Sequence, residues 1–183
     1  MKVIIDTTVL SLLFNPNAKP PIDKTTKQPL EHFKERVNYL IQTLNKDKTQ
    51  IIIPSPVLCE ILVPVTVGQK ETIDTLSRSP FKILGFDQRA SIECSIMLRK
   101  YLSEAKNKKE SKANFNKQKV KFDHQIFSIG LVEQVEAIYS DDGDIKLLGK
   151  LFNIPVIGSH ELDISLSDKQ MKMVFPIEPG DRK

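Results

Sequence analysis

Short runs of branched apolar residues alternate along this chain with longer stretches in which apolar residues recur at helical spacing. The runs lie at residues 3–5, 50–53, 81–86, 137–140 and 154–157. Runs of this length predict buried strands, and the stretches between them predict helices. The sequence therefore predicts an α/β fold: a three-layer α/β/α sandwich of Rossmann-like type around a central, mostly parallel sheet of about five strands.

Two segments interrupt this alternation. Residues 15–29 are rich in proline and predict an exposed excursion, because proline cannot continue a helix. Residues from about 103 to 121 predict a basic insertion between a helix expected over 87–105 and another expected over 123–135. With these two additions, residues 1–183 are expected to form a single domain.

Positive charge is concentrated in the basic insertion and the residues just before it. The chain has a net charge of +4, yet residues 99–121 alone hold nine Lys or Arg against two Glu. Such a segment can follow a phosphate backbone, or it can be a solvated insertion that contributes to solubility. The candidate RNA-binding residues are Lys106, Lys108, Lys109, Lys112, Lys117, Lys119 and Lys121.

The cysteines and the apolar runs indicate where the protein resides. Cys59 and Cys94 lie far apart, match no zinc or redox spacing, and are expected to be buried thiols of a reducing compartment. No apolar run approaches the roughly 18 residues that span a bilayer. The sequence therefore predicts a cytoplasmic protein with no membrane partner.

Acidic residues follow several predicted strands or open the helices beside them. Asp6 ends the first strand, Glu60 lies in the helix after the second, Asp123 is expected in the first turn of the helix before the fourth, and Asp142 and Asp144 are expected in the loop after the fourth. Ligands of such sheets bind beyond the carboxyl ends of the strands, so these carboxylates are expected to meet at one rim. The simpler alternatives are that Asp6 only caps the next helix and that residues 141–144 only form a turn.

Carboxylates gathered in this way repel one another. At roughly 5 Å and an effective dielectric constant of about 20, each pair costs on the order of 3 kcal/mol. A divalent cation would remove this repulsion, and an all-oxygen ligand set favours Mg²⁺ or Mn²⁺ over zinc. Because Mg²⁺ commonly completes its shell with substrate phosphate oxygens, the site predicts phosphoryl chemistry. The sequence has no glycine-rich phosphate-binding motif, and none of its three histidines has the spacing of a zinc site or a triad.

With these residues in place, the chain resembles the PIN-domain nucleases, the family that includes the VapC-type toxins of bacterial toxin–antitoxin pairs. The resemblance rests on four motifs in order: VIIDTTVL at 3–10, PSPVLCE at 54–60, KFD at 121–123 and YSDDGD at 139–144. The family often has asparagine where Thr8 stands.

The resemblance implies a metal-dependent endoribonuclease that leaves a 5′-phosphate and a 3′-hydroxyl. It implies that one or two Mg²⁺ or Mn²⁺ ions are held by Asp6, Glu60, Asp123 and one or both of Asp142 and Asp144, with Thr7, Thr8 and Ser140 as hydroxyls that orient carboxylates or waters. The implied partners are RNA and, for a toxin, an antitoxin protein that docks over the acidic site. A homodimer is a further expectation, although the sequence shows no self-complementary patch to support it.

Two other functions fit part of the pattern. One is a catalytically silent domain of the same fold that binds RNA or a protein through residues 99–121. The other is a haloacid-dehalogenase-like phosphatase, in which Asp6 would be the nucleophile, Ser55 would follow the second strand, and Asp141 and Asp142 would form the late acidic pair. Such phosphatases usually need an aspartate where Thr8 stands, and they leave Glu60 unexplained.

Overall fold

A parallel five-stranded sheet forms the centre of the protein, in the spatial order β3-β2-β1-β4-β5. Its strands are β1 (Lys2–Ile5), β2 (Gln50–Pro54), β3 (Phe81–Leu84), β4 (Ala137–Tyr139) and β5 (Val156–Ile157). The structure is a computed structural model, and it describes residues 1–15, 17–23, 26–65, 67–107 and 117–170. The predicted number of strands and their parallel arrangement are confirmed, while β3 and β5 are each two residues shorter than expected.

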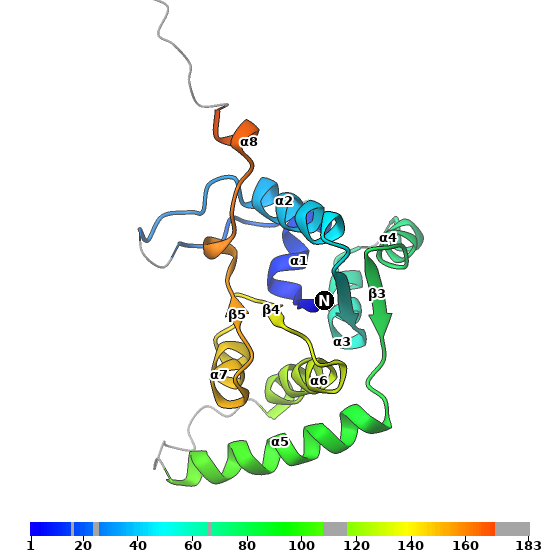
Figure 1. Ribbon diagram of the computed structural model, residues 1–183, viewed down its shortest axis with the longest axis vertical. Helices are drawn as coiled ribbons and strands as arrows, with labels where there is room; N and C mark the ends of the chain where they lie inside the picture. The colour runs from blue at the N-terminus through cyan, green and yellow to red at the C-terminus, as the bar shows by residue number, and fades with distance from the viewer. Residues whose placement is uncertain (16, 24–25, 66, 108–116, 171–183) are drawn as a thin grey trace, which may run out of the picture.

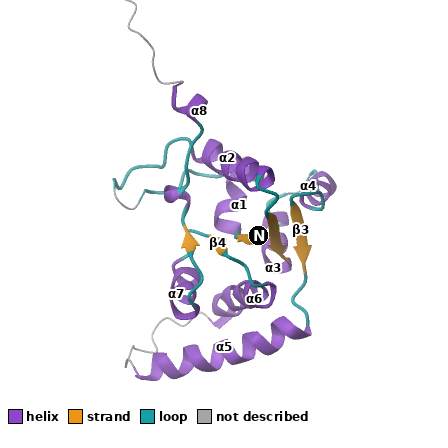
Figure 2. Cartoon of the chain, in the orientation of Figure 1, coloured by secondary structure: helices purple, strands orange, loops and turns teal. Residues whose placement is uncertain are grey.

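Helices cover both faces of the sheet, as Figure 1 shows. The helices are α1 (Thr7–Phe14), α2 (Phe33–Lys46), α3 (Ser55–Leu62), α4 (Gln69–Leu76), α5 (Gln88–Asn107), α6 (Lys117–Glu133), α7 (Gly143–Phe152) and α8 (Leu166–Gln170), with a 3₁₀ turn η2 (Ser159–Glu161) after β5. Helices α1 and α2 lie on one side of the sheet, α6 and α7 lie on the other, and α5 packs against the outside of α6 (Figures 1 and 2). This is the expected three-layer α/β/α sandwich.

The middle strand is apolar on both of its faces because both faces are covered. Val3, Ile4 and Ile5 are all buried, and the neighbouring residues 51–53 of β2 are buried as well. Continuous apolar runs of this kind are typical of parallel strands between two helical layers. The core therefore fixes the position of β1, and with it the place where the chain leaves that strand at Asp6.

Helix α6 begins earlier than the sequence predicts. It starts at Lys117, so Asp123 is its seventh residue and lies in the second turn, not in the first. Helix α5 continues to Asn107, slightly beyond the end expected near residue 105. The apolar pattern alone predicts a later start, whereas lysine and glutamine are good helix formers that extend a helix beyond its apolar positions.

Helix α7 also begins earlier than expected, and this moves Asp144 out of the predicted loop. The helix starts at Gly143, and the Asp142 carboxylate caps it by accepting the amide N–H groups of Asp144, at 2.7 Å, and of Ile145, at 3.4 Å. A side-chain cap satisfies amides that would otherwise lack partners in the first turn, which offsets the low helix propensity of glycine. Asp142 and Asp144 are thereby fixed on one helix terminus.

Three smaller sequence predictions have mixed outcomes. Cys94 is buried as expected, but Cys59 is exposed because it lies on the outer side of α3. Residues 15–29 contain no strand or helix among those that are described, apart from an isolated bridge between Ile22 and Pro29. Within the described ranges, every helix is too short or too polar to cross a bilayer.

The order of the strands decides where a site can form. The chain passes from β1 to β2 on one side and later returns to place β4 on the other side of β1. Ligands of open parallel sheets bind beyond the carboxyl ends of the strands, at such a reversal. Asp6 directly follows β1, and Ser140 directly follows β4, so both lie at this point of the sheet.

Candidate active site

Asp6 is a buried carboxylate held by neutral donors. Its Oδ2 accepts hydrogen bonds from the hydroxyls of Ser140, at 2.8 Å, and Thr8, at 2.9 Å. The carboxylate also accepts the amide of Thr8, at 3.5 Å, and so caps α1. Burial is the largest influence on this group and raises the pKa of Asp6, while the hydrogen bonds act in the opposite direction. The expected alternative role, helix capping, is therefore real, and it coexists with a fixed position at the sheet edge.

The same two hydroxyls tie Asp6 to the loop after β4. The Thr8 hydroxyl oxygen accepts the amide of Asp141 at 2.9 Å, and the Ser140 hydroxyl oxygen accepts the amide of Asp142 at 3.0 Å. Each hydroxyl donates to Asp6 and accepts from the loop, which uses both capacities of a hydroxyl group. Thr8 and Ser140 thereby set the distance between the end of β1 and the start of α7.

Glu60 reaches the same region from α3. Its side chain is exposed, and its carboxylate accepts a hydrogen bond from the hydroxyl of Thr7, the residue that follows Asp6. The structure therefore places Glu60 beside the residues that follow β1.

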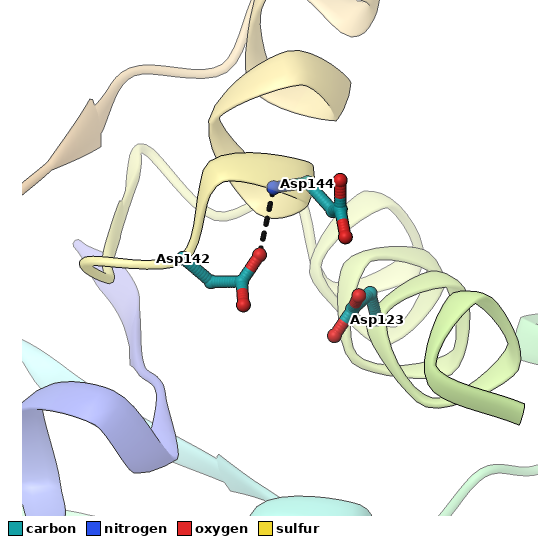
Figure 3. Close-up of side chains that lie close together, drawn as sticks. All are labelled: Asp123, Asp142 and Asp144. Atoms are coloured by element: carbon teal, nitrogen blue, oxygen red, sulfur yellow. Dashed lines mark hydrogen bonds between the residues drawn. The ribbon is translucent and has the colours of Figure 1, made fainter. Parts of the chain in front are cut away.

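Three aspartates from two helices lie close together, as Figure 3 shows. Each of Asp123, Asp142 and Asp144 offers one carboxylate oxygen, and these oxygens all lie within 4.8 Å of one another. Asp123 on α6 is buried, Asp142 is half-buried and Asp144 is exposed, so the cluster opens from the core to the surface. Oxygens that bind one Mg²⁺ at about 2.1 Å lie roughly 3 to 4 Å apart, so a small inward movement would bring this set to ligand spacing.

The structure separates the roles of the neighbouring aspartates after β4. The Asp141 carboxylate accepts the amide of Ser159, at 2.8 Å, and so links the β4 loop to the segment after β5. Asp142 and Asp144 instead join Asp123. The sequence alone left open which members of the run 141–144 could bind metal, because adjacent aspartates in a turn are equivalent until their directions are known.

Solved structures share this arrangement of strands and helices. A chain in the DNA-bound crystal structure of VapBC2 from Rickettsia felis superposes with a TM-score of 0.54 at 16% identity, over 86% of this chain and 98% of that one. A chain in DNA-bound VapBC from Salmonella typhimurium gives 0.52 at 11% identity, over 87% and 98%. VapC20 of Mycobacterium tuberculosis, described as a Sarcin-Ricin loop cleaving toxin, gives 0.50 at 11% identity, over 80% and 95%.

The chain has the fold of the VapC PIN domains. The fold expected from the resemblance is thereby confirmed. No protein-family model and no curated protein sequence matches this chain, so the likeness is one of structure.

Within this VapC-type fold, the candidate donors fall into two groups. Asp123, Asp142 and Asp144 form the compact cluster, while Asp6 and Glu60 are connected to it through hydroxyls and backbone amides. All of these donors are carboxylate oxygens, the ligands that Mg²⁺ and Mn²⁺ prefer. A carboxylate has about four acceptor positions, so Asp142 can cap α7 and still bind a cation.

The structure does not test the candidate RNA-binding lysines. Lys108, Lys109 and Lys112 lie outside the described residues. Lys106 belongs to the end of α5, and Lys117, Lys119 and Lys121 belong to the first turns of α6, with their backbone alone described. Their role in binding RNA stays a prediction.

Proposed function

We propose that this protein is a metal-dependent endoribonuclease that acts as the toxin of a toxin–antitoxin pair. The observation that carries the proposal is the meeting of Asp123, Asp142 and Asp144 within 4.8 Å at the carboxyl edge of a VapC-type sheet. The described activity of VapC20, cleavage of the Sarcin-Ricin loop, supports RNA as the substrate class.

The cofactor would be Mg²⁺ or Mn²⁺, bound by Asp123, Asp142 and Asp144 together with Asp6 and Glu60. Such an ion would lower the pKa of bound water and stabilise charge on the oxygens of a phosphodiester. The protein itself would hold the carboxylates in position. Thr8 and Ser140 keep Asp6 in register with the β4 loop, and Thr7 orients Glu60.

An antitoxin would mask this site. VapBC complexes with the same fold support a protein partner for the chain. A segment that covers the acidic cluster would need a positive group there, and an arginine suits carboxylates because it can bind two of their oxygens at once. The basic segment 99–121 would contact RNA when the antitoxin is absent.

The test is RNA cleavage in the presence of Mn²⁺ or Mg²⁺. We expect the wild-type protein to cut RNA with either ion and to lose activity in EDTA. Asp6→Asn should abolish cleavage because it removes a negative ligand while keeping an oxygen acceptor for Thr8 and Ser140. Unchanged circular dichroism would show that the fold is intact.

Asp141→Asn is the matched control, since it makes the same change of charge on a carboxylate that bonds to Ser159. It should retain cleavage within a few-fold of the wild type. Full Mn²⁺-dependent cleavage by Asp6→Asn would rule out the proposed site. RNA binding without cleavage would favour a silent module, and a phosphoryl group trapped on Asp6 would favour a phosphatase.

A further inference from the structure

A hollow lies beside α7, on the flank away from the acidic cluster. It has a volume of about 470 Å³ and is lined by Lys146, Gly149, Lys150, Ile154, Val156 and Glu161. Successive residues of a helix are about 100° apart, so Asp144 and Lys146 face nearly opposite flanks of α7. The acidic cluster and the hollow are thus neighbours on either side of one helix terminus.

One end of the hollow, at Lys146 and Glu161, borders the same edge of the sheet as the carboxylates, whereas residues 153–155 at its other end precede β5. Gly158 directly follows β5, the strand that pairs with β4, and Ser159 donates its amide to Asp141 in the β4 loop. The segment after β5 is therefore hydrogen-bonded to the residue that precedes Asp142. A strand of nucleic acid lying across the acidic cluster would reach this segment next.

Lys146, which lines the hollow, and His160 of η2 converge on Glu161. The Lys146 ammonium lies 3.5 Å from Oε1 of Glu161, and Nε2 of His160 lies 3.7 Å from the same oxygen. Glu161 is itself held by the amide of Gly158, at 2.9 Å, and this hydrogen bond is the main reason that the pKa of Glu161 is lowered. Glu161 thus positions Lys146 and His160 at one point.

Gly158 lets these side chains approach the backbone closely. A Cβ atom at this position would lie 2.8 Å from the Lys146 ammonium and 2.8 Å from the imidazole ring of His160. Any larger residue would push one of them away. The space over Gly158 is therefore occupied by the Lys146 ammonium and the His160 imidazole, which come from different elements.

The charges at the hollow favour an anion. Two lysines line it, Lys146 and Lys150, against a single carboxylate, Glu161. An ammonium group has three donors, so Lys146 can bond to Glu161 and still donate to another acceptor. Lys150 is exposed and lies one turn further along the same flank of α7. Ile154 and Val156 supply an apolar wall beside these charges.

We propose that this hollow binds the nucleotide next to the scissile bond, with Lys146, Lys150 and His160 contacting its phosphate and the apolar wall contacting its sugar. The inference rests on the proposed ribonuclease function, since it assigns a binding position for the same RNA. Lys146 lies four residues beyond Asp142, about 6 Å along the helix axis and on the flank of α7 away from Asp144, so an RNA strand that crosses the amino end of α7 would bring a neighbouring nucleotide to it. The acidic cluster would cut, and the hollow would fix which bond lies over it.

The experiment measures RNA binding by the full-length Asp6→Asn protein, so that the RNA is bound but not cut. Adding Lys146→Ala to this protein should raise the Kd roughly three- to tenfold and reduce the slope of log Kd against log salt by about one. The matched control is Lys70→Ala, which removes the same charge from an exposed position on α4 and should leave the Kd unchanged.

A second measurement locates the phosphate. RNAs that carry one uncharged methylphosphonate linkage are compared, with the linkage moved one position at a time along the strand. One position beside the cleaved bond should weaken binding by the protein with Lys146, and the same position should have no further effect once Lys146→Ala is present. The inference would be overturned if the loss of affinity from Lys146→Ala and the loss from the uncharged linkage add at every position.

The outcomes separate this inference from the proposed function. If the wild type cleaves RNA with metal but the two losses of affinity add at every linkage, the proposed phosphate contact is wrong and the nuclease function stands. Coupling between Lys146 and one linkage in a protein whose wild type never cleaves RNA would support a phosphate contact at Lys146 and overturn the nuclease. Absence of RNA binding would overturn both.

Discussion

Strand β1 has a charged residue at each end, and the two ends stabilise charge in opposite ways. At its amino end, Lys2 lies 2.8 Å from Glu133, and Arg89 lies 3.6 Å from the same carboxylate. The hydrogen bond from Lys2 is the main reason that the pKa of Glu133 is lowered. At its carboxyl end, Asp6 is bonded to two hydroxyls and an amide, and burial raises its pKa.

The difference agrees with the proposed function, in which the carboxyl end of the sheet binds a cation. The acid at the amino end is neutralised by cations of the chain itself, so its interactions are complete within the fold. At the carboxyl end, Asp6 is held by neutral donors, and three further aspartates approach within 4.8 Å of one another nearby. Carboxylates this close repel one another, and a bound divalent cation would reduce that repulsion, as the proposed function requires.

The largest effect is expected from removing the Asp6 carboxylate, the hydrogen-bond acceptor at the carboxyl end of β1. Asp6→Ala should lower the free energy of unfolding by about 2 to 4 kcal/mol, because α1 loses its cap and the hydroxyls of Thr8 and Ser140 lose an acceptor. Asp6→Asn keeps an oxygen there and should stay within about 1 kcal/mol of the wild type. Urea denaturation in EDTA measures both variants.

Equal losses for the two Asp6 variants would mean that the hydroxyls do not depend on this acceptor. The position of Asp6 would then come from strand packing alone, and the proposed roles of Thr8 and Ser140 would be wrong.

The second test adds a divalent cation. With free Mn²⁺ at about one hundred times its Kd, binding should stabilise the wild-type protein by about 2.7 kcal/mol, which raises the Tm by roughly 5 to 10 °C. Asp144→Asn should lose most of this response. In EDTA its Tm should equal or exceed that of the wild type, because the variant relieves repulsion with Asp123 and Asp142.

Asp74→Asn serves as the control for this metal response, since it removes an exposed acid from α4. It should keep the full Mn²⁺ shift. A wild-type protein whose Tm does not respond to Mn²⁺ or Mg²⁺ would show that the cluster is no metal site.

The sequence predicts the sheet well because strand burial leaves a direct pattern of apolar residues. The runs around Ile4 and Ile52 are apolar on both faces, and this can be read without coordinates. The ends of the helices are harder to predict. Asp123 lies deeper in its helix than expected and Asp144 lies in a helix instead of a loop, because helix propensity and a side-chain cap, not apolar spacing, decide where α6 and α7 begin.

The contacts of the site depend on distances that the sequence does not contain. Thr8 and Ser140 could be assigned as orienting hydroxyls from the resemblance, but their bonds to the amides of Asp141 and Asp142 follow from the pairing of β1 with β4. The convergence of Lys146 with His160 has no local signal either. The nearest signal in the sequence is a glycine, Gly158, directly after a strand. Its role becomes visible only when the side chain of Lys146 on α7 is seen to lie over it.

The smallest expected effect tests the amino end of β1. Glu133 has a pKa below the ordinary value of 4.5, so its ionised form is favoured in the folded protein. Its stabilising contribution is therefore complete above pH 4.5 and is lost as the pH falls through the lowered pKa. Glu133→Gln should lower the free energy of unfolding by about 1 kcal/mol at pH 7, and the difference from the wild type should vanish in acid.

Glu136→Gln, which alters a nearby exposed acid, should lower the free energy of unfolding by less at every pH. A difference for Glu133→Gln that persists in acid would mean that packing of the side chain, and not its charge, stabilises this end of the sheet.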